Sequence, residues 1–300
     1  MTRTILVTGG SGQVGRALGL LDWPEGIDLH APTRAELDLA DPASIGAAFA
    51  ARAYAAVINC AAYTAVDKAE DDVVAAFAAN AMGPAVLAAA TAAAGVPIVH
   101  VSTDYVFDGS APGFYREDAA VAPLGVYGAS KLAGELAVAS GNPRHVIVRT
   151  AWVLSDHGSN FAKTMLRVGA TNAHLRVVDD QRGCPTSAAD IATTLQTIAL
   201  RLLDRDDAPM GIFHFVNAGE ASWCDLARFI FAEASAQGGP SPAVQAIATA
   251  DYPTRARRPA NSRLDTRKIA DTYGITPRPW QQAVAEIVST LAPHYRKQTA

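Results

Sequence analysis

The chain has 300 residues, which is enough for one large hydrophobic core or for a nucleotide-binding domain with a smaller lobe. Hydrophobic residues make up 50% of the chain and charged residues 18%, a balance that excludes a disordered protein. The formal net charge is −4, so the chain lacks the basic surplus that nucleic-acid binding requires, and no nucleic-acid partner is expected.

Cysteine, histidine and hydropathy patterns exclude further classes of protein. Cys60, Cys184 and Cys224 are odd in number and widely spaced, so they predict neither a disulfide framework nor a C-x-x-C site. The seven histidines show no paired metal-ligand spacing, and no metal site is predicted. The apolar run 5–7 is too short for a signal peptide, and Asn, Gly and Pro interrupt the Ala-rich stretch 75–99. We therefore expect no membrane contact and a cytoplasmic location.

The first half of the chain alternates strand and helix patterns. Short apolar or β-branched runs predict strands at 5–8, 28–32, 56–59, 98–102 and 146–150. Helical patterns lie between them, at 13–21, 42–51, 73–94 and 127–140. This alternation predicts an α/β fold with a parallel, doubly wound sheet, in which ligands bind beyond the carboxyl ends of the strands.

The pattern loosens after about residue 150, where loops rich in Gly, Pro, Asp and Arg separate helical segments such as 222–236 and 280–291. We predict a nucleotide-binding domain over 1–150 and, over 151–300, mainly a smaller C-terminal lobe that carries substrate contacts. Some segments of that second half are expected to return to the sheet.

The first predicted strand runs into a glycine-rich turn. Gly9, Gly12 and Gly15 have the spacing G-x-x-G-x-x-G, a variant of the dinucleotide-binding fingerprint. The first glycine permits the tight turn, the second lets the backbone approach a pyrophosphate, and the third lets helix and strand pack closely. Any tight turn between a strand and a helix can carry such a triplet. The predicted cofactor contacts in this turn are Gly9, Gly10, Ser11, Gly12, Gln13, Val14 and Gly15.

Tyr127 and Lys131 lie four residues apart in a predicted helix, so both side chains point from the same face. The ordinary pKa of tyrosine is about 10, and a fixed positive charge nearby favours the phenolate. The pair therefore predicts a proton donor for catalysis near neutral pH. The alternative is two surface residues on an ordinary helix, and the nucleotide signature favours the catalytic interpretation.

Several further motifs carry a resemblance to a known family. They read G-G-S-G-Q-V-G at 9–15, N-C-A-A-Y-T-A-V-D-K-A-E at 59–70, S-T-D-Y-V-F-D-G at 102–109, Y-G-A-S-K-L-A-G-E at 127–135, R-T-A-W-V at 149–153, N-F-A-K-T-M at 160–165, D-Q-R-G-C-P-T at 180–186 and R-R-P-A-N-S at 257–262. The chain resembles the extended short-chain dehydrogenase/reductase superfamily and, more narrowly, the dTDP-4-dehydrorhamnose reductases over nearly its whole length. The resemblance implies a Rossmann-type fold and reduction of the C4 ketone of dTDP-4-dehydro-β-L-rhamnose to dTDP-L-rhamnose by NAD(P)H, the last step of dTDP-L-rhamnose synthesis.

The resemblance also implies catalytic roles. Tyr127 would protonate the developing alkoxide, and Lys131 would lower the tyrosine pKa and hold the nicotinamide ribose hydroxyls. Thr103 matches the Ser/Thr of the superfamily's triad and would bind the carbonyl oxygen. Asp104 would bind the sugar, or else cap the following turn. Asn80 matches a helix asparagine that props the active site.

The resemblance implies cofactor contacts outside the glycine turn as well, at Arg34, Asp38, Leu39, Ala61, Ala62 and Thr64. Arg34 follows the second strand, where NAD enzymes often carry an acid for the ribose 2′-hydroxyl. An arginine there suits a 2′-phosphate, so NADPH is favoured over NADH. Asp38 has the alternative interpretation of one more solvated carboxylate.

For the substrate, the resemblance implies contacts from Trp152 and from Arg257, Arg258, Asn261 and Ser262, of which the arginines suit a diphosphate. A core tryptophan and a solvated basic loop are the alternatives. Some relatives dimerise through a magnesium ion held partly by a glutamate after the third glycine. Arg16 stands there instead, so neither that metal nor that form of dimer is implied, and a homodimer of another form stays possible.

Two other functions compete with the reductase. One is a non-catalytic NADP-binding subunit resembling the regulatory subunit of methionine adenosyltransferase, which has the same fold. The other is an epimerase, dehydratase or reductase that acts on another nucleotide sugar. Thr103, Tyr127 and Lys131 argue for chemistry, while Arg34 and the narrow S-T-D-Y-V-F-D-G and R-R-P-A-N-S blocks favour the reductase.

Overall fold

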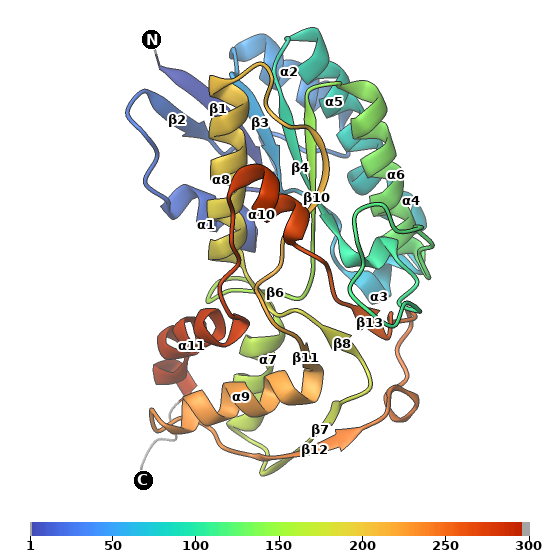
Figure 1. The fold of residues 1–300 in the computed structure, drawn as a ribbon, viewed down its shortest axis with the longest axis vertical. Helices are drawn as coiled ribbons and strands as arrows, with labels where there is room; N and C mark the ends of the chain where they lie inside the picture. Colours follow the sequence, from blue (N-terminus) through green and yellow to red (C-terminus); the bar gives the residue numbers. More distant parts are fainter. Residues whose placement is uncertain (1, 296–300) are drawn as a thin grey trace.

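The structure is a computed structural model that describes residues 2–295. An α/β domain occupies the upper part of the molecule in Figure 1, and a smaller lobe lies below it. The sequence prediction of an α/β fold with a doubly wound parallel sheet is confirmed.

The α/β domain is built on a six-stranded sheet with the order β10-β5-β4-β3-β1-β2. All neighbouring strands pair in parallel. The direction in which strands are added reverses between β1 and β3, and this switch point is where such sheets bind ligands. The strands are β1 (Arg3–Thr8), β2 (Ile27–His30), β3 (Ala56–Asn59), β4 (Ile98–Thr103), β5 (His145–Thr150) and β10 (Gly211–His214).

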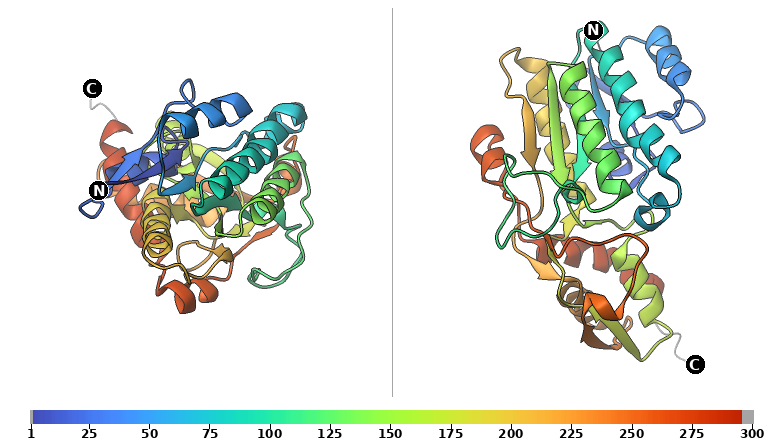
Figure 2. Two further views of the ribbon diagram at one scale, coloured as in Figure 1. Left: turned by 90° about the horizontal axis from the view of Figure 1, so that it is seen from above. Right: turned by 90° about the vertical axis from the view of Figure 1, so that its right-hand side faces the viewer.

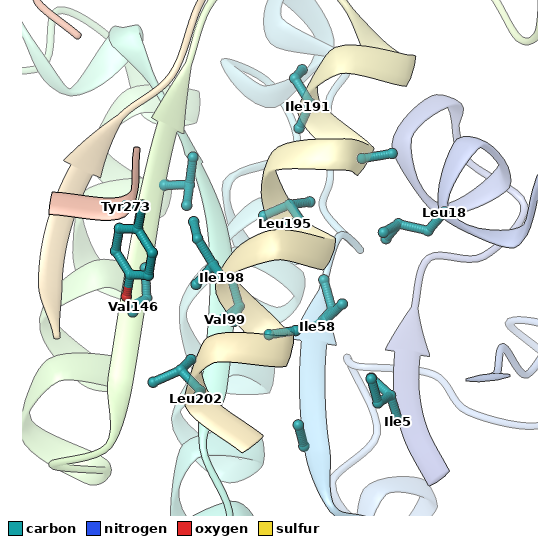
Figure 3. Close-up of a cluster of buried hydrophobic side chains, with 14 of the residues drawn as sticks. Ile5, Leu18, Ile58, Val99, Val146, Ile191, Leu195, Ile198, Leu202 and Tyr273 are labelled. Atoms are coloured by element: carbon teal, nitrogen blue, oxygen red, sulfur yellow. The ribbon is translucent and has the colours of Figure 1, made fainter. Parts of the chain in front are cut away.

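Helices cover both faces of this sheet, as the side view in Figure 2 shows. One face carries α1 (Gln13–Leu20), α8 (Ala188–Asp204) and α10 (Arg267–Tyr273). The other face carries α2 (Pro42–Ala51), α4 (Val73–Phe77), α5 (Gly83–Ala93) and α6 (Val126–Gly141), with the short α3 (Val66–Ala69) near the start of α6. Figure 3 shows the core on the first face, where Ile191, Leu195 and Ile198 of α8 pack over the sheet.

The smaller lobe has a separate hydrophobic core. Its helices are α7 (Phe161–Gly169), α9 (Trp223–Ser235) and α11 (Trp280–Leu291), which pack on one another. Its short strands form three small sheets: β6 (Val153–Leu154) with β9 (Thr186–Ser187), β7 (His174–Val178) with β12 (Ala243–Ile247), and β8 (Arg182–Gly183) between β11 (Ala221–Ser222) and β13 (Asn261–Ser262). Short 3₁₀ helices span Asp104–Val106, Thr249–Asp251 and Ala292–Tyr295. Between the lobe's elements, the chain returns to the α/β domain with α8, β10 and α10.

One helical segment, Val73–Ala93, is long and apolar enough by length and composition to cross a membrane. A core helix of a globular fold passes the same test, and this segment runs through α4, a π-helical turn (Ala78–Met82) and α5. It packs against α6, and the polar Asn80 in its middle is fully buried and hydrogen-bonded. The segment is therefore explained as a helix of the α/β domain.

Helix α6 approaches its neighbours more closely than a side chain would permit. A Cβ atom at Gly134 would clash with the carbonyl oxygen of Asn80, and one at Gly128 would clash with the carbonyl oxygen of Tyr105. Both obstacles are backbone atoms, which cannot rotate away. Glycine at these two positions therefore sets how closely the helix packs on the π-helical turn and on the 3₁₀ turn that follows β4.

Replacing Gly134 with Ala is expected to destabilise the protein by about 1–3 kcal/mol, because the added methyl group forces α6 away from the π-helical turn. The measurement is the free energy of unfolding in urea. Gly19→Ala is the matched control, since a Cβ there meets nothing within 4 Å and alanine favours a helix. Equal stability of the two variants would contradict the proposed close approach.

Candidate active site

The residues predicted from the sequence gather at the carboxyl ends of four sheet strands, where the α/β domain faces the smaller lobe (Figure 1). Gly9 follows β1, Ala61 follows β3, Thr103 ends β4 and Trp152 follows β5. Parallel strands bring these positions to one edge, although they are far apart in the chain.

The glycine turn is shaped by close backbone contacts. Gly9 has φ +71°, and a Cβ there would lie 2.6 Å from the backbone nitrogen of Ala61. The N–H of Gly12 donates to the carbonyl oxygen of Gly9 (2.9 Å), and Gly12 then caps the start of α1 in an extended conformation. A Cβ at Gly15 would clash with that same carbonyl oxygen. The turn and the free N–H groups at the start of α1 therefore form a cradle that fits a pyrophosphate.

The neighbouring residues of the turn differ in exposure. Ser11 is exposed, whereas Gln13 and Val14 are half-buried. Gln13 accepts a hydrogen bond from the side-chain nitrogen of Asn160 (2.9 Å), which caps the start of α7. Gly10 packs against Ala31, which follows β2. The cofactor turn thus contacts both the second strand and the smaller lobe.

The loop after β2 presents Arg34 to solvent. Its side chain is 81% exposed, and its Nε donates to a carboxylate oxygen of Asp38 at 3.2 Å. A hydrogen bond from the N–H of Ala40, with a smaller contribution from Arg34, holds the pKa of Asp38 below its ordinary value. Leu39 is buried beside Gly83 at the start of α5. Arg34 and Asp38 therefore form one exposed pair, and Leu39 anchors the loop.

The backbone after β3 is tied to the catalytic helix through Asn80. This fully buried side chain accepts a bond from the N–H of Tyr63 (2.8 Å) and donates to the carbonyl oxygen of Tyr63 and the hydroxyl of Ser130. Ser130 in turn donates to the carbonyl oxygen of Tyr127. Asn80 thus links the segment containing Ala61, Ala62 and Thr64 to the residue that carries the phenol.

Helix α6 positions Tyr127 and Lys131 one turn apart. The N–H of Val126 at its start donates to a carboxylate oxygen of Glu70 (2.9 Å), and an extra Cβ at Gly125 would clash with that carboxylate. A carboxylate is favourable at a helix N-terminus because the first N–H groups lack partners within the helix. Glu70 therefore anchors the end of α6 that carries the predicted proton donor.

Lys131 lies almost fully inside the protein, with 2% of its surface exposed. Its Nζ donates to the carbonyl oxygen of Val101 at 2.7 Å and lies 3.5 Å from Nε2 of His100. Burial lowers the pKa of Lys131 to about 8, against an opposing influence of Glu135. The amine can therefore gain and lose a proton near neutral pH.

Tyr127 is half-buried, and the edge of its ring contacts Tyr105 at a centroid distance of 5.4 Å. Burial raises the pKa of Tyr127, while the neighbouring side chain of Thr103 has a smaller, lowering influence on it. Thr103 and Tyr127 are thus brought together as predicted for a catalytic pair. The predicted lowering of the tyrosine pKa by Lys131 is wrong for this structure, because burial raises the pKa and Lys131 is not among the groups that shift it.

Thr103 also bonds to Asp104, the next residue in the chain. Its hydroxyl donates to Oδ1 of Asp104 (3.0 Å) and accepts from the N–H of Tyr105, so Thr103 itself caps the 3₁₀ turn that Asp104 was the alternative candidate to cap. Oδ2 of Asp104 is buried and has no hydrogen-bond partner within residues 2–295. Burial raises the pKa of Asp104 to about 6, although hydrogen bonds from Ser262 and Thr103 oppose the shift.

Trp152 crosses from the sheet into the smaller lobe in a strained conformation. Among residues 2–295 it is the one non-glycine residue with positive φ, at +49°. Its indole stacks on Trp223 with a centroid distance of 3.5 Å, and a Cβ at Gly183 would also clash with the indole. A bulky residue with positive φ lowers the stability of the fold by about 1–3 kcal/mol, and such strained residues are common at functional sites. The fold therefore places an aromatic surface just beyond the end of β5, the strand that pairs with the end of β4 at Thr103.

The residues of the basic segment 257–262 have different surroundings in the structure. Arg258 donates to the hydroxyl of Tyr105 (2.9 Å) and to the carboxylate of Asp67 (2.5 Å), so it lies beside the catalytic region. Arg257 is exposed. Asn261 donates to the carbonyl oxygens of two residues in the 111–113 loop and accepts from the backbone and side chain of Arg263. The amide of Asn261 is therefore committed to holding that loop.

Four residues at the site were not assigned by sequence reasoning: Asp67, Glu70, His100 and Tyr105. Three of them lie inside the motifs N-C-A-A-Y-T-A-V-D-K-A-E and S-T-D-Y-V-F-D-G. Membership of these motifs was the feature of the sequence that could have indicated them. His100 precedes the second motif by two residues, and nothing in its local pattern singles it out. No three His, Cys, Asp or Glu side chains come close enough to hold a metal ion in the part of the chain that the structure describes.

Comparison with known proteins identifies the family. The family model described as "RmlD substrate binding domain" matches residues 2–292. A dTDP-4-dehydrorhamnose reductase of Sinorhizobium fredii is 46% identical over 288 residues, which are 96% of this chain and 97% of that protein. The chain belongs to the dTDP-4-dehydrorhamnose reductase family. The Escherichia coli K12 reductase is 38% identical, with 96% of this chain and 97% of that protein covered.

Solved structures of reductases agree with this assignment. That of Clostridium acetobutylicum has a TM-score of 0.89 at 38% identity and covers 96% of this chain and 99% of its own. That of Bacillus anthracis, in complex with NADP, has a TM-score of 0.88 at 32% identity, covering 97% and 100%. The family predicted from the sequence is confirmed, and with it the prediction of a reductase that uses a nicotinamide cofactor.

The buried Asp104 predicts a specific pH dependence of stability in this reductase. Its pKa rises from 3.8 to about 6, so the fold favours the protonated carboxyl. The stability that this proton contributes is present below pH 3.8 and is lost as the pH rises through about 6. Each pKa unit corresponds to about 1.4 kcal/mol, so charging Asp104 lowers the free energy of unfolding by about 3 kcal/mol at most.

Asp104→Asn is expected to raise the melting temperature at about pH 8, and the gain should shrink to nothing near pH 4, because the amide is neutral throughout. Thermal unfolding of both proteins across this range is the measurement. Asp206→Asn, at a fully exposed position, is the control and should show little difference. A gain that is equal at both pH values would contradict a buried, titrating carboxyl.

Proposed function

We propose that this protein reduces the C4 ketone of dTDP-4-dehydro-β-L-rhamnose to dTDP-L-rhamnose, with NADPH as the preferred cofactor. The observation that carries the proposal is the placement of Thr103 and Tyr127 side by side, with Lys131 one helical turn away, at the edge where the glycine turn opens. Relatives up to 46% identical over nearly the whole chain bear the name of this reductase.

The glycine turn is proposed to hold the cofactor pyrophosphate through backbone N–H groups. The segment with Ala61, Ala62 and Thr64 is proposed to line the adenosine and the pyrophosphate of the cofactor. The exposed guanidinium of Arg34 is available for a 2′-phosphate, with Asp38 holding its direction. When bound, the nicotinamide supplies the hydride for C4. The chain's own groups must then orient the ketone and deliver the proton.

Tyr127 is proposed to give its phenolic proton to the substrate oxygen as charge develops there. Thr103, whose hydroxyl neighbours the phenol, is placed to donate a hydrogen bond to the same oxygen. Burial makes the free phenolate costly, which drives the phenol to be reprotonated quickly. Lys131, with a pKa of about 8, is suited to supply that proton and to hold ribose hydroxyls.

The substrate is proposed to lie between the catalytic pair and the smaller lobe. The stacked indoles of Trp152 and Trp223 offer a rigid surface for the sugar, and the half-buried Arg258 is better placed than Arg257 to meet the diphosphate. Asn261 is assigned a positioning role, because the loop at 111–113 already uses its amide. Ser262 and Asp104 face one another and are proposed to contact the sugar.

The cytoplasm is the proposed compartment, because Cys60, Cys184 and Cys224 are all free thiols, as is common in reducing compartments. The proposed partner is a small nucleotide sugar. A homodimer and the absence of nucleic-acid and membrane partners stay predictions.

The test of the function is oxidation of NADPH in the presence of freshly generated dTDP-4-dehydro-β-L-rhamnose, with NADH measured alongside and the sugar product identified by NMR. Turnover to dTDP-L-rhamnose is expected. Protein that binds NADPH but does not oxidise it with this substrate would contradict the proposal and favour either another nucleotide sugar or a binding subunit. Tightly bound NAD released on denaturation would indicate an epimerase.

Tyr127→Phe is expected to lower kcat by about 10²-fold or more while NADPH binds as before, because the change removes only the proton donor. Tyr105→Phe is the matched control, since it removes the neighbouring hydroxyl that binds Arg258 and should mainly raise the substrate KM. Steady-state kinetics and cofactor fluorescence separate the two effects. Wild-type kcat in Tyr127→Phe would exclude the assigned role.

Arg34→Ala is expected to reduce kcat/KM for NADPH at least tenfold, the equivalent of about 1.4 kcal/mol, and to leave NADH nearly unaffected. Loss of the guanidinium removes the group available to a 2′-phosphate. Arg176→Ala, at an exposed position of the smaller lobe, is the control. If the ratio of the two cofactors does not change, another residue must recognise the 2′-phosphate.

A further inference from the structure

Three polar residues form a row across neighbouring strands beneath the catalytic helix. Thr8 of β1 is the register partner of Asn59 of β3, and Asn59 is the register partner of His100 of β4. All three are buried, with at most 1% of their surface exposed. The row ends at Lys131 of α6, so it connects the base of the glycine turn with the catalytic lysine.

The side chains in this row are joined end to end. The hydroxyl of Thr8 donates to Oδ1 of Asn59 (2.6 Å), and Nδ2 of Asn59 donates to Nδ1 of His100 (2.9 Å). A neutral imidazole that accepts at Nδ1 carries its proton on Nε2. That Nε2 lies 3.5 Å from Nζ of Lys131, so the row presents an N–H to a neutral lysine amine.

The hydrogen bonds between Asn59, His100 and Lys131 can also run in the opposite direction. An ammonium at Lys131 requires an acceptor at Nε2, which places the imidazole proton on Nδ1. A half-turn of the Asn59 amide then offers its oxygen to that proton and its nitrogen to the hydroxyl of Thr8. Asparagine, histidine and threonine can each both donate and accept, so no buried polar atom of the row between Asn59 and Lys131 loses its partner.

Among the described residues, no other group that can reverse in this way is hydrogen-bonded to Lys131. Val101 offers a carbonyl oxygen, which only accepts. Glu135 is held by two hydrogen bonds from Arg149, at 2.9 and 2.7 Å, and burial raises the pKa of the Cys60 thiol to about 12, which keeps it neutral. Burial beside Lys131 holds the pKa of His100 well below its ordinary value, so the imidazole is neutral too. His100 is therefore the partner that can follow a change in the charge of Lys131.

We propose that His100, oriented by Asn59 and Thr8, is a positioning residue that keeps Lys131 hydrogen-bonded in both of its charge states. The inference rests on the role proposed above for Lys131. In that role, Nζ gives a proton to the Tyr127 phenolate after the phenol has protonated the substrate oxygen, and a proton from water later restores the ammonium. The row reverses twice in each cycle: each time, water delivers a proton to one ring nitrogen of His100 and takes the proton from the other, and the row transfers no proton to the substrate.

The first test follows the imidazole directly. ¹⁵N chemical shifts of His100 in the whole protein report which ring nitrogen carries the proton. As the pH rises through the titration of Lys131, the proton should move from Nδ1 to Nε2. Asn59→Asp fixes the direction, because a carboxylate only accepts: the proton should stay on Nδ1 throughout. A wild-type imidazole that keeps one tautomer across this titration would overturn the proposal.

The second test is kinetic. The alkaline limb of the kcat profile should shift upward by roughly one pH unit in Asn59→Asp, because a fixed acceptor favours the ammonium. An unmoved limb in a folded variant would contradict the proposed reversal.

His100→Gln and His100→Leu provide an independent comparison should Asn59→Asp fail to fold. Glutamine can both donate and accept and should retain most of kcat, whereas leucine should lose at least tenfold with near-normal thermal stability. Equal kcat in the two variants would overturn the positioning role. Lys131→Met, measured beside them, separates the role proposed for Lys131 from the reversal of the row. If Lys131→Met remains active, the role of Lys131 is wrong. If it is inactive and the His100 tautomer of the wild-type protein never changes, only the proposed reversal is wrong.

Discussion

The close seating of α6 against the sheet is the constraint on which the rest of the site depends. Gly128 and Gly134 permit the helix to lie against the backbone of the residues at Tyr105 and Asn80, where a Cβ would clash. Glu70 anchors the start of the helix, and Lys131 enters the protein from its buried face. Had the helix stood off by the width of a methyl group, the phenol would not reach Thr103 and the amine would not reach Val101.

Burial, more than any single charge, sets the protonation of the site. It lowers the pKa of Lys131 and His100 and raises that of Asp104 and Tyr127, which in each case favours the neutral form. The permanent charges are paired nearby, as Arg258 is with Asp67. A site arranged in this way favours proton positions that leave each buried group neutral, because an unpaired charge in an apolar surrounding is costly.

The sequence predicted the sheet well because strands and helices alternate with clear periods in the first half, and the glycine turn and the pair Tyr127 and Lys131 are local motifs. It predicted that some segments of the second half return to the sheet but not that β10 would be the added strand and α8 a covering helix, since a periodic pattern does not say which neighbour an element joins. His100 was missed for the same reason: its partners become visible only in the register of three strands. Asn261 matched a motif, yet its partners in the 111–113 loop depend on tertiary contacts.

The smaller lobe is connected to the sheet at the point where chemistry is proposed to occur. Trp152 leaves β5 with positive φ and contacts Gly183 and Trp223 of the lobe, while Gln13 of the glycine turn binds Asn160 at the start of α7. Both connections join a residue next to a strand end with a residue of the lobe. Because both contacts join the two parts of the molecule, a shift of the lobe would move Trp152 and the glycine turn together, and under the proposed function this would couple the placement of the sugar to that of the nucleotide.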